Sequence, residues 1–254
     1  MNCTNGVVHG WRALVPAALL VVVLAGCQGP GPAPQRTSRP LADPLFQTRP
    51  PPTLPSVTTL PLEPVAPPPR RGKRLDGRVI VVDPGHGGKD PGAQALSRLP
   101  EKTIVLNIAL RVTRLLEERG ARVFMTRSTD EFIELEQRAA LADRVRADLL
   151  VSIHADSAQR ASAAGTKVFT ARTASQASRT AAGRIAAAFE RAGMSSRGVD
   201  QAGFKVLVAH SRPAVLIECG FLTNRTEAQL LNTTAHQERL AVAIVEGVVD
   251  ALGH

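Results

Sequence analysis

The sequence predicts an α/β fold: a three-layer single domain with a mostly parallel central sheet and helices on both faces. First, several short runs are continuously aliphatic, as in strands that are buried on both sides of a parallel sheet. Second, these runs alternate with helical stripes at the spacing of strand–helix–strand units with right-handed crossovers. Third, 254 residues with 44% hydrophobic content suffice for one sizeable core.

The first half of the domain alternates strands with two helices. The aliphatic run 79–82 ends in a Pro/Gly-rich turn, which predicts a strand followed by a loop. A helix over 101–119 is expected because Pro100 stands where a helix starts and Gly120 where one ends. The remaining elements are a strand over 121–126, a helix marked by Leu135, Ala139, Ala142 and Val145, and a strand over 148–156.

The second half begins with an expected edge strand over 165–170. An alanine-rich helix over 174–192 follows and is stopped by Gly193. Residues 204–208 and 213–218 are expected to form two short strands. Asn224 predicts the cap of a short helix. The last element is an amphipathic helix with the apolar face Leu240, Ile244, Val245, Val248 and Leu252.

Residues 1–27 predict a lipoprotein signal peptide. Residues 13–24 are almost wholly Ala, Leu and Val, and these 12 residues are too few to span a bilayer comfortably. The sequence Leu24-Ala25-Gly26-Cys27 resembles a bacterial lipoprotein signal, in which Cys27 is lipidated and becomes the mature N-terminus. An ordinary signal peptide cleaved nearby is the alternative. We therefore expect a periplasmic protein anchored by lipid, and Gln28 favours the outer membrane.

Residues 28–74 predict a disordered, partly polyproline-II tether. They hold 14 of the 19 prolines and few large apolar residues, so they cannot bury a core. At about 3.1 Å per residue, the 47 residues of the tether could reach on the order of 100 Å from a membrane. The folded domain is expected over 75–254, and we expect it to be a monomer.

The predicted folded domain lacks the strong positive charge that is typical of nucleic-acid-binding proteins, and it has few aromatic residues. Five of the nine net positive charges lie in the tether, and only three remain in residues 75–254. The chain has no tyrosine, and its one tryptophan lies in the signal region, so platforms for base stacking are scarce. Cys219 lies in an apolar run and is expected to be a buried, reduced thiol, which leaves no disulfide in the mature domain.

Three chemically active side chains follow or interrupt predicted strands. His86 lies in the glycine-rich loop after the first strand, and His154 stands near the end of the third. Glu218 interrupts an apolar strand, and since lone carboxylates are rarely buried, it should emerge at the strand end facing a charge. Ligands bind at the carboxyl ends of strands in open α/β sheets, so one metal-centred pocket is indicated. The competing interpretation of His86 is a turn that happens to contain histidine.

Glu101 adds a carboxylate at the start of a helix. With His86 and His154 it supplies two imidazoles and one carboxylate, a set that binds zinc and leaves a fourth position open for water. Glu218 is the remaining candidate to take a proton from water and pass it to a leaving amine. The alternative for Glu101 is a first-turn carboxylate favoured by the helix dipole. The intervals between these residues match no short metal motif.

Six segments closely resemble the zinc-dependent N-acetylmuramoyl-L-alanine amidases of the cell-wall amidase type 3 family. They are residues 81–93, 101–102, 126–127, 135 with 138, 152–157 and 213–224, in the order of the family and over essentially all of 77–252. The resemblance implies that His86, Glu101 and His154 bind Zn²⁺ and that Glu218 is catalytic. It implies a catalytic domain that hydrolyses the amide between N-acetylmuramic acid and L-alanine in peptidoglycan, for cell-wall remodelling or daughter-cell separation.

Two features depart from the family pattern. Members dedicated to septum splitting carry a helical insertion that can block the zinc, whereas only 63 residues separate His154 from Glu218, so we expect an unoccluded site. Relatives often have polar residues before the last strand, where this chain has Val208 and Ala209 followed by His210.

Other polar residues near these segments receive simpler interpretations. His210 is expected to be a satisfied loop histidine, and His236 and His254 surface residues. Asp83 and Asp156 could orient the ligands or simply form turns. Lys89 and Asp90 are interpreted as loop structure.

Two other functional classes are alternatives to an amidase. The first is a nucleotide hydrolase, but the loop Gly85–Lys89 lacks the spacing of a phosphate-binding loop, and no Ser or Thr follows Lys89. The second is a catalytically inactive peptidoglycan-binding lipoprotein. The chain keeps all four residues expected to bind the metal or transfer protons, namely His86, Glu101, His154 and Glu218, which argues against this second class.

Overall fold

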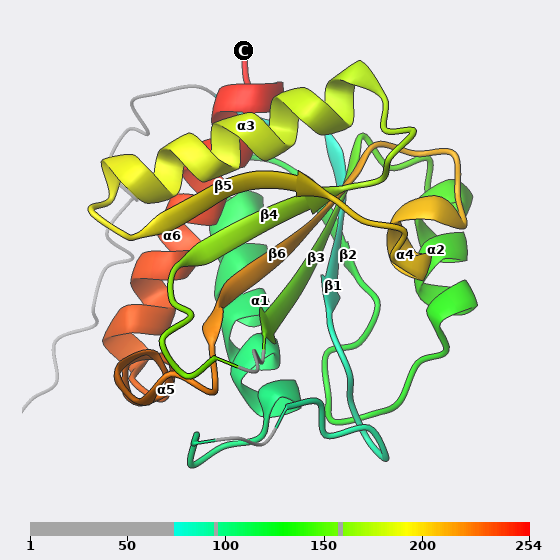
Figure 1. The fold of residues 1–254 in the computed structure, drawn as a ribbon. Coiled ribbons are helices and arrows are strands. Elements are labelled where there is room, and N and C mark those ends of the chain that lie inside the picture. The colour runs from blue at the N-terminus through cyan, green and yellow to red at the C-terminus, as the bar shows by residue number, and fades with distance from the viewer. Residues whose placement is uncertain (1–73, 94–95, 157–159) are drawn as a thin grey trace, which may run out of the picture. The chain divides into compact units, whose positions relative to one another are not determined.

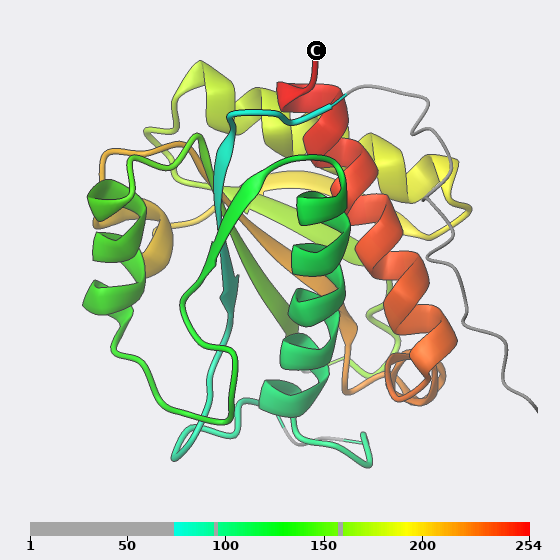
Figure 2. The same ribbon diagram turned by 180° about the vertical axis from the view of Figure 1, so that it is seen from behind.

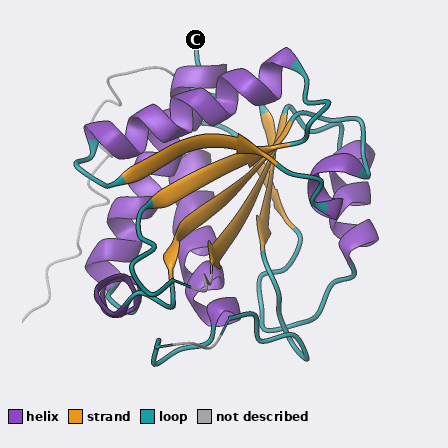
Figure 3. Ribbon diagram, in the orientation of Figure 1, coloured by secondary structure: helices purple, strands orange, loops and turns teal. Residues whose placement is uncertain are grey.

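The computed structural model describes residues 74–93, 96–156 and 160–254. The predicted signal peptide, the lipidation site Cys27 and the tether up to residue 73 lie outside the described residues. In the described part, six strands form one sheet (Figures 1 and 3). Their bounds are β1 (Val79–Pro84), β2 (Arg122–Met125), β3 (Leu149–Asp156), β4 (Thr166–Thr170), β5 (Ser196–Gln201) and β6 (Ala214–Phe221). The helices are α1 (Glu101–Glu118), α2 (Leu135–Arg144), α3 (Gln176–Arg191), α4 (Lys205–Val208), α5 (Arg225–Leu231) and α6 (Thr234–Leu252).

The sheet is mostly parallel, as predicted. Its strand order is β2-β1-β3-β6-β4-β5. The first four of these run parallel, β4 runs antiparallel to β6, and β5 is parallel to β4. The carboxyl ends of β1, β3 and β6 therefore meet the starts of β4 and β5 at one edge. This is the edge where α/β sheets place their ligands.

Helices cover both faces of the sheet and make the three predicted layers. Alternate residues of β3 point to opposite faces, with Leu149, Val151 and Ile153 in the core under α1, α3 and α6. Figure 2 shows α1 and α6 in front of this face. Leu150 and Leu216 pack instead into a smaller core under α2 and α4. His154 follows Leu150 by four residues, so its side chain points to the face of the sheet covered by α2 and α4.

Local signals at the ends of helices are confirmed. Gly120 follows α1 with φ +94°, a left-handed conformation that favours glycine at a helix end. The side chain of Asn224 accepts hydrogen bonds from the backbone N–H groups of Thr226 and Glu227, which caps α5. The amphipathic face of α6 and the buried thiol of Cys219 are also as predicted.

Two predictions about the second half of the domain are wrong. The strand over 165–170 is not at the edge, because β5, a strand that was not predicted, pairs with its outer side. The β5 sequence is polar and mostly exposed, so it lacks the hydrophobic alternation that indicates a strand. Residues 205–208 form the short helix α4 and not a strand. The side chains of Val206 and Leu207 are buried in the core shared with α2, which overrides the β propensity of the valines.

No helix within residues 74–93, 96–156 and 160–254 combines the length and the apolar character needed to cross a membrane.

Candidate metal centre

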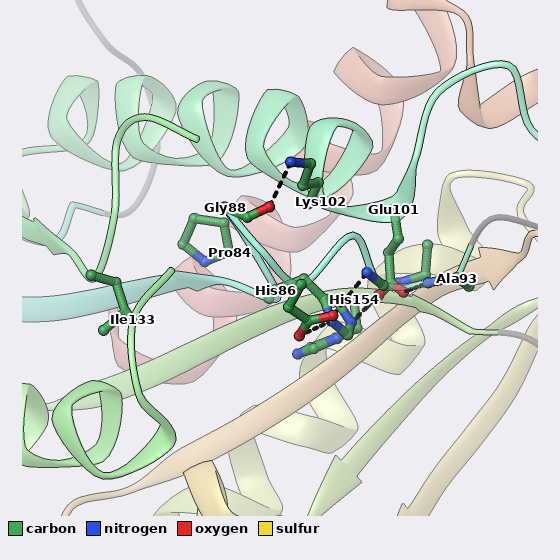
Figure 4. Close-up of polar contacts among 12 residues, drawn as sticks. Pro84, His86, Gly88, Ala93, Glu101, Lys102, Ile133 and His154 are labelled. Atoms are coloured by element: carbon green, nitrogen blue, oxygen red, sulfur yellow. Dashed lines mark hydrogen bonds and ion pairs between the residues drawn. The ribbon is translucent and has the colours of Figure 1, made fainter. Parts of the chain in front are cut away.

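Three predicted ligands converge at the carboxyl edge of the sheet. His86 lies in the loop directly after β1, Glu101 is the first residue of α1, and His154 lies near the end of β3. Their ligand atoms all lie within 4.8 Å of one another (Figure 4). The Oε1 atom of Glu101 is 3.0 Å from Nε2 of His86 and 3.1 Å from Nδ1 of His154. The structure therefore brings together side chains that are remote in sequence.

Glu101 is held in place by backbone donors as well as by the two imidazoles. Its Oε1 accepts a hydrogen bond from the backbone N–H of Ala155 at 3.0 Å, and its Oε2 accepts one from Ala93 at 2.8 Å. Its side chain is almost fully buried. Burial alone would raise the pKa of Glu101, but hydrogen bonds from His154 and His86 outweigh it and bring the pKa far below its usual range. Glu101 is therefore an ionised carboxylate aimed between two imidazoles.

Asp90 orients His86. Its Oδ2 lies 2.8 Å from Nδ1 of His86, so the proton on Nδ1 is donated to Asp90 and Nε2 faces Glu101. Burial alone would lower the pKa of His86, but the bonds to Glu101 and Asp90 raise it above its ordinary value. The prediction that Asp90 is loop structure is confirmed, since its Oδ1 accepts a hydrogen bond from the backbone N–H of Gly92 at 3.0 Å, but it missed the contact with His86. This contact could not be predicted from the sequence, because an aspartate in a Gly-rich loop can equally well form a turn or orient a ligand.

Asp83, by contrast, does not touch a ligand. Its carboxylate accepts hydrogen bonds from Thr126 Oγ1 at 2.6 Å, Ser152 Oγ at 2.7 Å and Arg138 Nη1 at 2.9 Å. Its side chain is 1% exposed, so the charge is compensated inside the protein. The alternative that Asp83 orients a ligand directly is therefore wrong. Its partner Arg138 also donates hydrogen bonds to the loop that carries His86.

Two buried arginines hold the loop that carries His86. Arg138 donates to the carbonyl oxygens of Ile133 at 2.9 Å, Pro84 at 2.7 Å and His86 at 2.6 Å. His86 has φ +57°, a conformation that is strained for a residue with a side chain, so this carbonyl anchor matters.

Arg127 reaches the same loop from another side. It donates to the carbonyls of Pro84 at 3.1 Å and Gly85 at 2.6 Å, and to Lys102 of α1 at 2.9 Å. It thereby ties the loop to the helix that carries Glu101. Both arginines belong to segments of the sequence resemblance, but reasoning from the residues assigned them no role. One signal was available for Arg138, which lies next to Ala139 and one helical turn before Ala142, on the buried side of α2.

Glycines make room for the ligand side chains. A Cβ atom at Gly92, whose φ is +66°, would lie 2.6 Å from Oε2 of Glu101 and 2.7 Å from the His86 ring. A Cβ at Gly85 would collide with the ring of His154. Close approach of this kind requires glycine, so the backbone is shaped around these three side chains.

Glu218 lies beside the three ligands. It pairs in register with His154 across β3 and β6, which puts both side chains on the same face of the sheet. It is 8% exposed, and its Oε2 has no hydrogen-bond partner among the described residues. Burial, then the nearby charges of Asp156 and Glu101, raise its pKa well above the ordinary value. A buried, unpartnered carboxyl group with a raised pKa is typical of a group that transfers protons.

The other three histidines among the described residues lie outside the cluster. His210 is a satisfied loop histidine, as predicted, because its Nε2 contacts the carbonyl of Val206 at 2.9 Å and its Nδ1 accepts from the N–H of Arg212 at 3.0 Å. His254 is exposed. The prediction that His236 is a surface residue is only partly right, since its ring is half-buried and its Nδ1 is buried with no partner among the described residues.

The donor set fits a divalent metal with nitrogen and oxygen preference. Two imidazole nitrogens and one ionised carboxylate are what a catalytic zinc site uses, with a further position left for water. The hydrogen bond that His86 donates to Asp90 and the close approach of Gly85 and Gly92 support ligands of this kind. Next to the ligands, a hollow of about 350 Å³ is lined by His86, His154, Phe132, Ile133 and Val206 among others.

Comparisons with known proteins agree on one family. A family model described as N-acetylmuramoyl-L-alanine amidase matches residues 80–250. The uncharacterized protein YqiI of Bacillus subtilis (strain 168) is 38% identical over 190 residues, which cover 72% of this chain and 89% of that protein. N-acetylmuramoyl-L-alanine amidase AmiA of Escherichia coli (strain K12) is 34% identical over 226 residues, covering 71% and 78%. The solved catalytic domain of CwlV, an N-acetylmuramoyl-L-alanine amidase from Bacillus (Paenibacillus) polymyxa var. colistinus, is similar with a TM-score of 0.64 and 37% identity, covering 68% of this chain and 97% of that one.

Proposed function

The chain belongs to the N-acetylmuramoyl-L-alanine amidase family, and from this premise we propose that it works with one zinc ion held by His86, Glu101 and His154. It is an enzyme that hydrolyses the amide between N-acetylmuramic acid and L-alanine in peptidoglycan. The observation that supports the metal proposal is the convergence of three ligand atoms within 4.8 Å around an ionised Glu101. When bound, zinc would act as a Lewis acid towards the amide carbonyl and lower the pKa of water.

Glu218 is the proposed general base and acid. Its side chain lies on the same face as that of His154, and its Oε2 has no hydrogen-bond partner among the described residues. It would accept a proton from the attacking water and deliver it to the nitrogen of L-alanine as the amide breaks. The raised pKa supports the second half of this task, since a carboxyl group that holds its proton can donate it to a leaving amine.

The protein's place in the cell is part of the proposal. We propose that Cys27 carries lipid, that residues 28–74 form a tether, and that the monomeric domain works in the periplasm, with the outer membrane favoured. Such an arrangement would let the catalytic domain reach the wall from its membrane, for remodelling or daughter-cell separation. The described chain between β3 and β6 forms β4, α3, β5 and α4, and this element order supports our proposal that the site is unoccluded.

The test is digestion of purified sacculi by the protein and by Glu218→Gln, followed by mass spectrometry. The unchanged protein is expected to release tetrapeptides and leave bare glycan strands. Glu218→Gln is expected to keep its zinc and to lose about 10²–10⁴-fold in activity, the usual worth of general acid–base catalysis. Glu117→Gln, an exposed position on α1, is the matched control and should keep full activity.

Two results would contradict the proposal. If Glu218→Gln digests sacculi as well as the control, Glu218 is not the proton carrier. If the unchanged protein binds zinc and wall material but never exposes a free alanine amino group, the inactive binding lipoprotein is the correct alternative.

A further inference from the structure

A second hollow lies at the same edge of the sheet, on the far side of Glu218 from β1. Its volume is about 540 Å³, and it is lined by Asp156, Arg160, Lys167, Phe169, Arg197 and Phe221 among others. We call it the basic pocket. Three of these six side chains are cationic and two are aromatic. The hollow beside His86 combines Phe132, Ile133, Leu135 and Val206 with three carboxylates and one cationic side chain, those of Asp83, Asp90, Glu134 and Arg138. The two hollows therefore differ in chemistry.

Strand register places the basic pocket directly beside the catalytic residue. Lys167 of β4 pairs with Glu218 of β6, and Glu218 pairs with His154 of β3. The side chains of these three residues thus stand in a row on one face of the sheet. Because His154 also lines the hollow beside His86, the candidate metal centre and Glu218 lie between the two hollows. An extended substrate cleaved at this centre would enter one hollow on each side of the scissile bond.

The charge of the basic pocket is not fully neutralised by the protein. Lys167 is paired with Asp200 at 2.7 Å, and the carboxylate of Asp156 also lines the pocket. None of the ion pairs formed among the described residues involves Arg160 or Arg197. The guanidinium of Arg197 lies over the ring of Phe221, 5.3 Å from its centre, which restrains an otherwise mobile side chain. Arginine in this setting is suited to a carboxylate, which it can bind through two parallel hydrogen bonds.

We propose that the basic pocket binds the free carboxylate of the residue that follows L-alanine in the stem peptide, with Arg160 and Arg197 as its principal partners. This inference rests on the proposed function and adds a direction to it: the peptide side of the cleaved amide lies over β4 and β5. The muramic acid side then lies over the hollow beside His86. Arg160 and Arg197 would thus determine specificity without taking part in the chemistry.

The test uses two soluble disaccharide tetrapeptides that differ only in the second residue of the peptide. In one its free carboxylate is kept, and in the other it is converted to the amide. The unchanged protein is expected to hydrolyse the acid with a kcat/KM about three- to tenfold above that of the amide, because each exposed ion pair has only modest strength. The Arg160→Gln/Arg197→Gln double variant is expected to bring this ratio close to one by raising KM for the acid. Arg184→Gln, an exposed arginine of α3 outside the pocket, is the control and should keep the ratio.

The outcomes separate this inference from the proposed function. Equal hydrolysis of acid and amide by the unchanged protein overturns the pocket assignment and leaves the amidase proposal standing. So does a double variant that loses the same factor on both substrates. Absence of any hydrolysis of sacculi or soluble substrates overturns the proposed function and the pocket assignment together. Arg160 and Arg197 are exposed, and circular dichroism with zinc content confirms that the variants are folded.

Discussion

Replacing Arg138 by lysine tests whether the protein prepares its metal site through the backbone of His86. Arg138 donates hydrogen bonds to Asp83 and to the carbonyls of Pro84, Ile133 and His86. Lysine keeps a positive charge for Asp83 but has a single nitrogen, which cannot serve the same set of acceptors. The charge pair survives in part, whereas the anchor on the His86 carbonyl is lost.

The size of the effect follows from the backbone conformation of His86. Its φ of +57° is unfavourable for a residue with a side chain, at a cost of about 1–3 kcal/mol. In the unchanged protein, the bond from Arg138 helps to hold this conformation before any metal binds. In Arg138→Lys, zinc binding must supply that free energy, so the zinc dissociation constant is expected to rise by about 5- to 150-fold.

The assay is a zinc titration in competition with a chelating dye, together with peptide release at limiting and at saturating zinc. Arg138→Lys is expected to be nearly inactive at limiting zinc and to recover most of its activity at saturation. Arg144→Lys, an exposed position on the same helix, is the matched control. If Arg138→Lys loses folding stability but binds zinc as tightly as the control, the argument that Arg138 positions His86 is refuted.

Two further predictions follow from contacts near the site and at the start of α6. Asp90→Ala removes the acceptor for Nδ1 of His86 and is expected to weaken zinc binding about 10- to 100-fold, measured by the same titration; unchanged affinity would show that the ring is oriented without Asp90. Burial, and to a smaller extent the charge of Arg239, lowers the pKa of His236 from its ordinary value of 6.5. The neutral ring therefore contributes stability above about pH 6.5, and this stability is lost as the pH falls through the pKa of the folded state. His236→Gln is expected to remove this loss of stability at low pH. It is also expected to raise Tm by about 2–4 °C, because glutamine at this position would complete a capping box with Thr233. Calorimetry of both proteins from pH 8 to pH 5 tests this, and an identical pH dependence of Tm would contradict it.

Much of the fold was determined by the sequence itself, because the relevant signals are local. The aliphatic run of β1 and the stripe of α1 indicate their elements without reference to the rest of the chain. The helix ends at Gly120 and Asn224 are also local signals. Gly120 ends α1 by its left-handed backbone conformation, and the side chain of Asn224 caps α5 by accepting hydrogen bonds from residues that directly follow it. His86, Glu101, His154 and Glu218 could be selected as a set because they stand in segments that closely resemble one family.

Tertiary structure alone decided how those elements and side chains meet. Residues 205–208 form a helix because Val206 and Leu207 pack in the core next to α2. The residues of β5 form a strand because β4 supplies their hydrogen-bond partners. Asp90 and Arg138 act on His86 through contacts that depend on how the chain folds, and Arg138 lies 52 positions after the carbonyl of His86 that it binds. The basic pocket exists only because β4 pairs antiparallel with β6 and so places Lys167 opposite Glu218. Register between distant segments is set by the packing of the whole core, and no local pattern of residues encodes it.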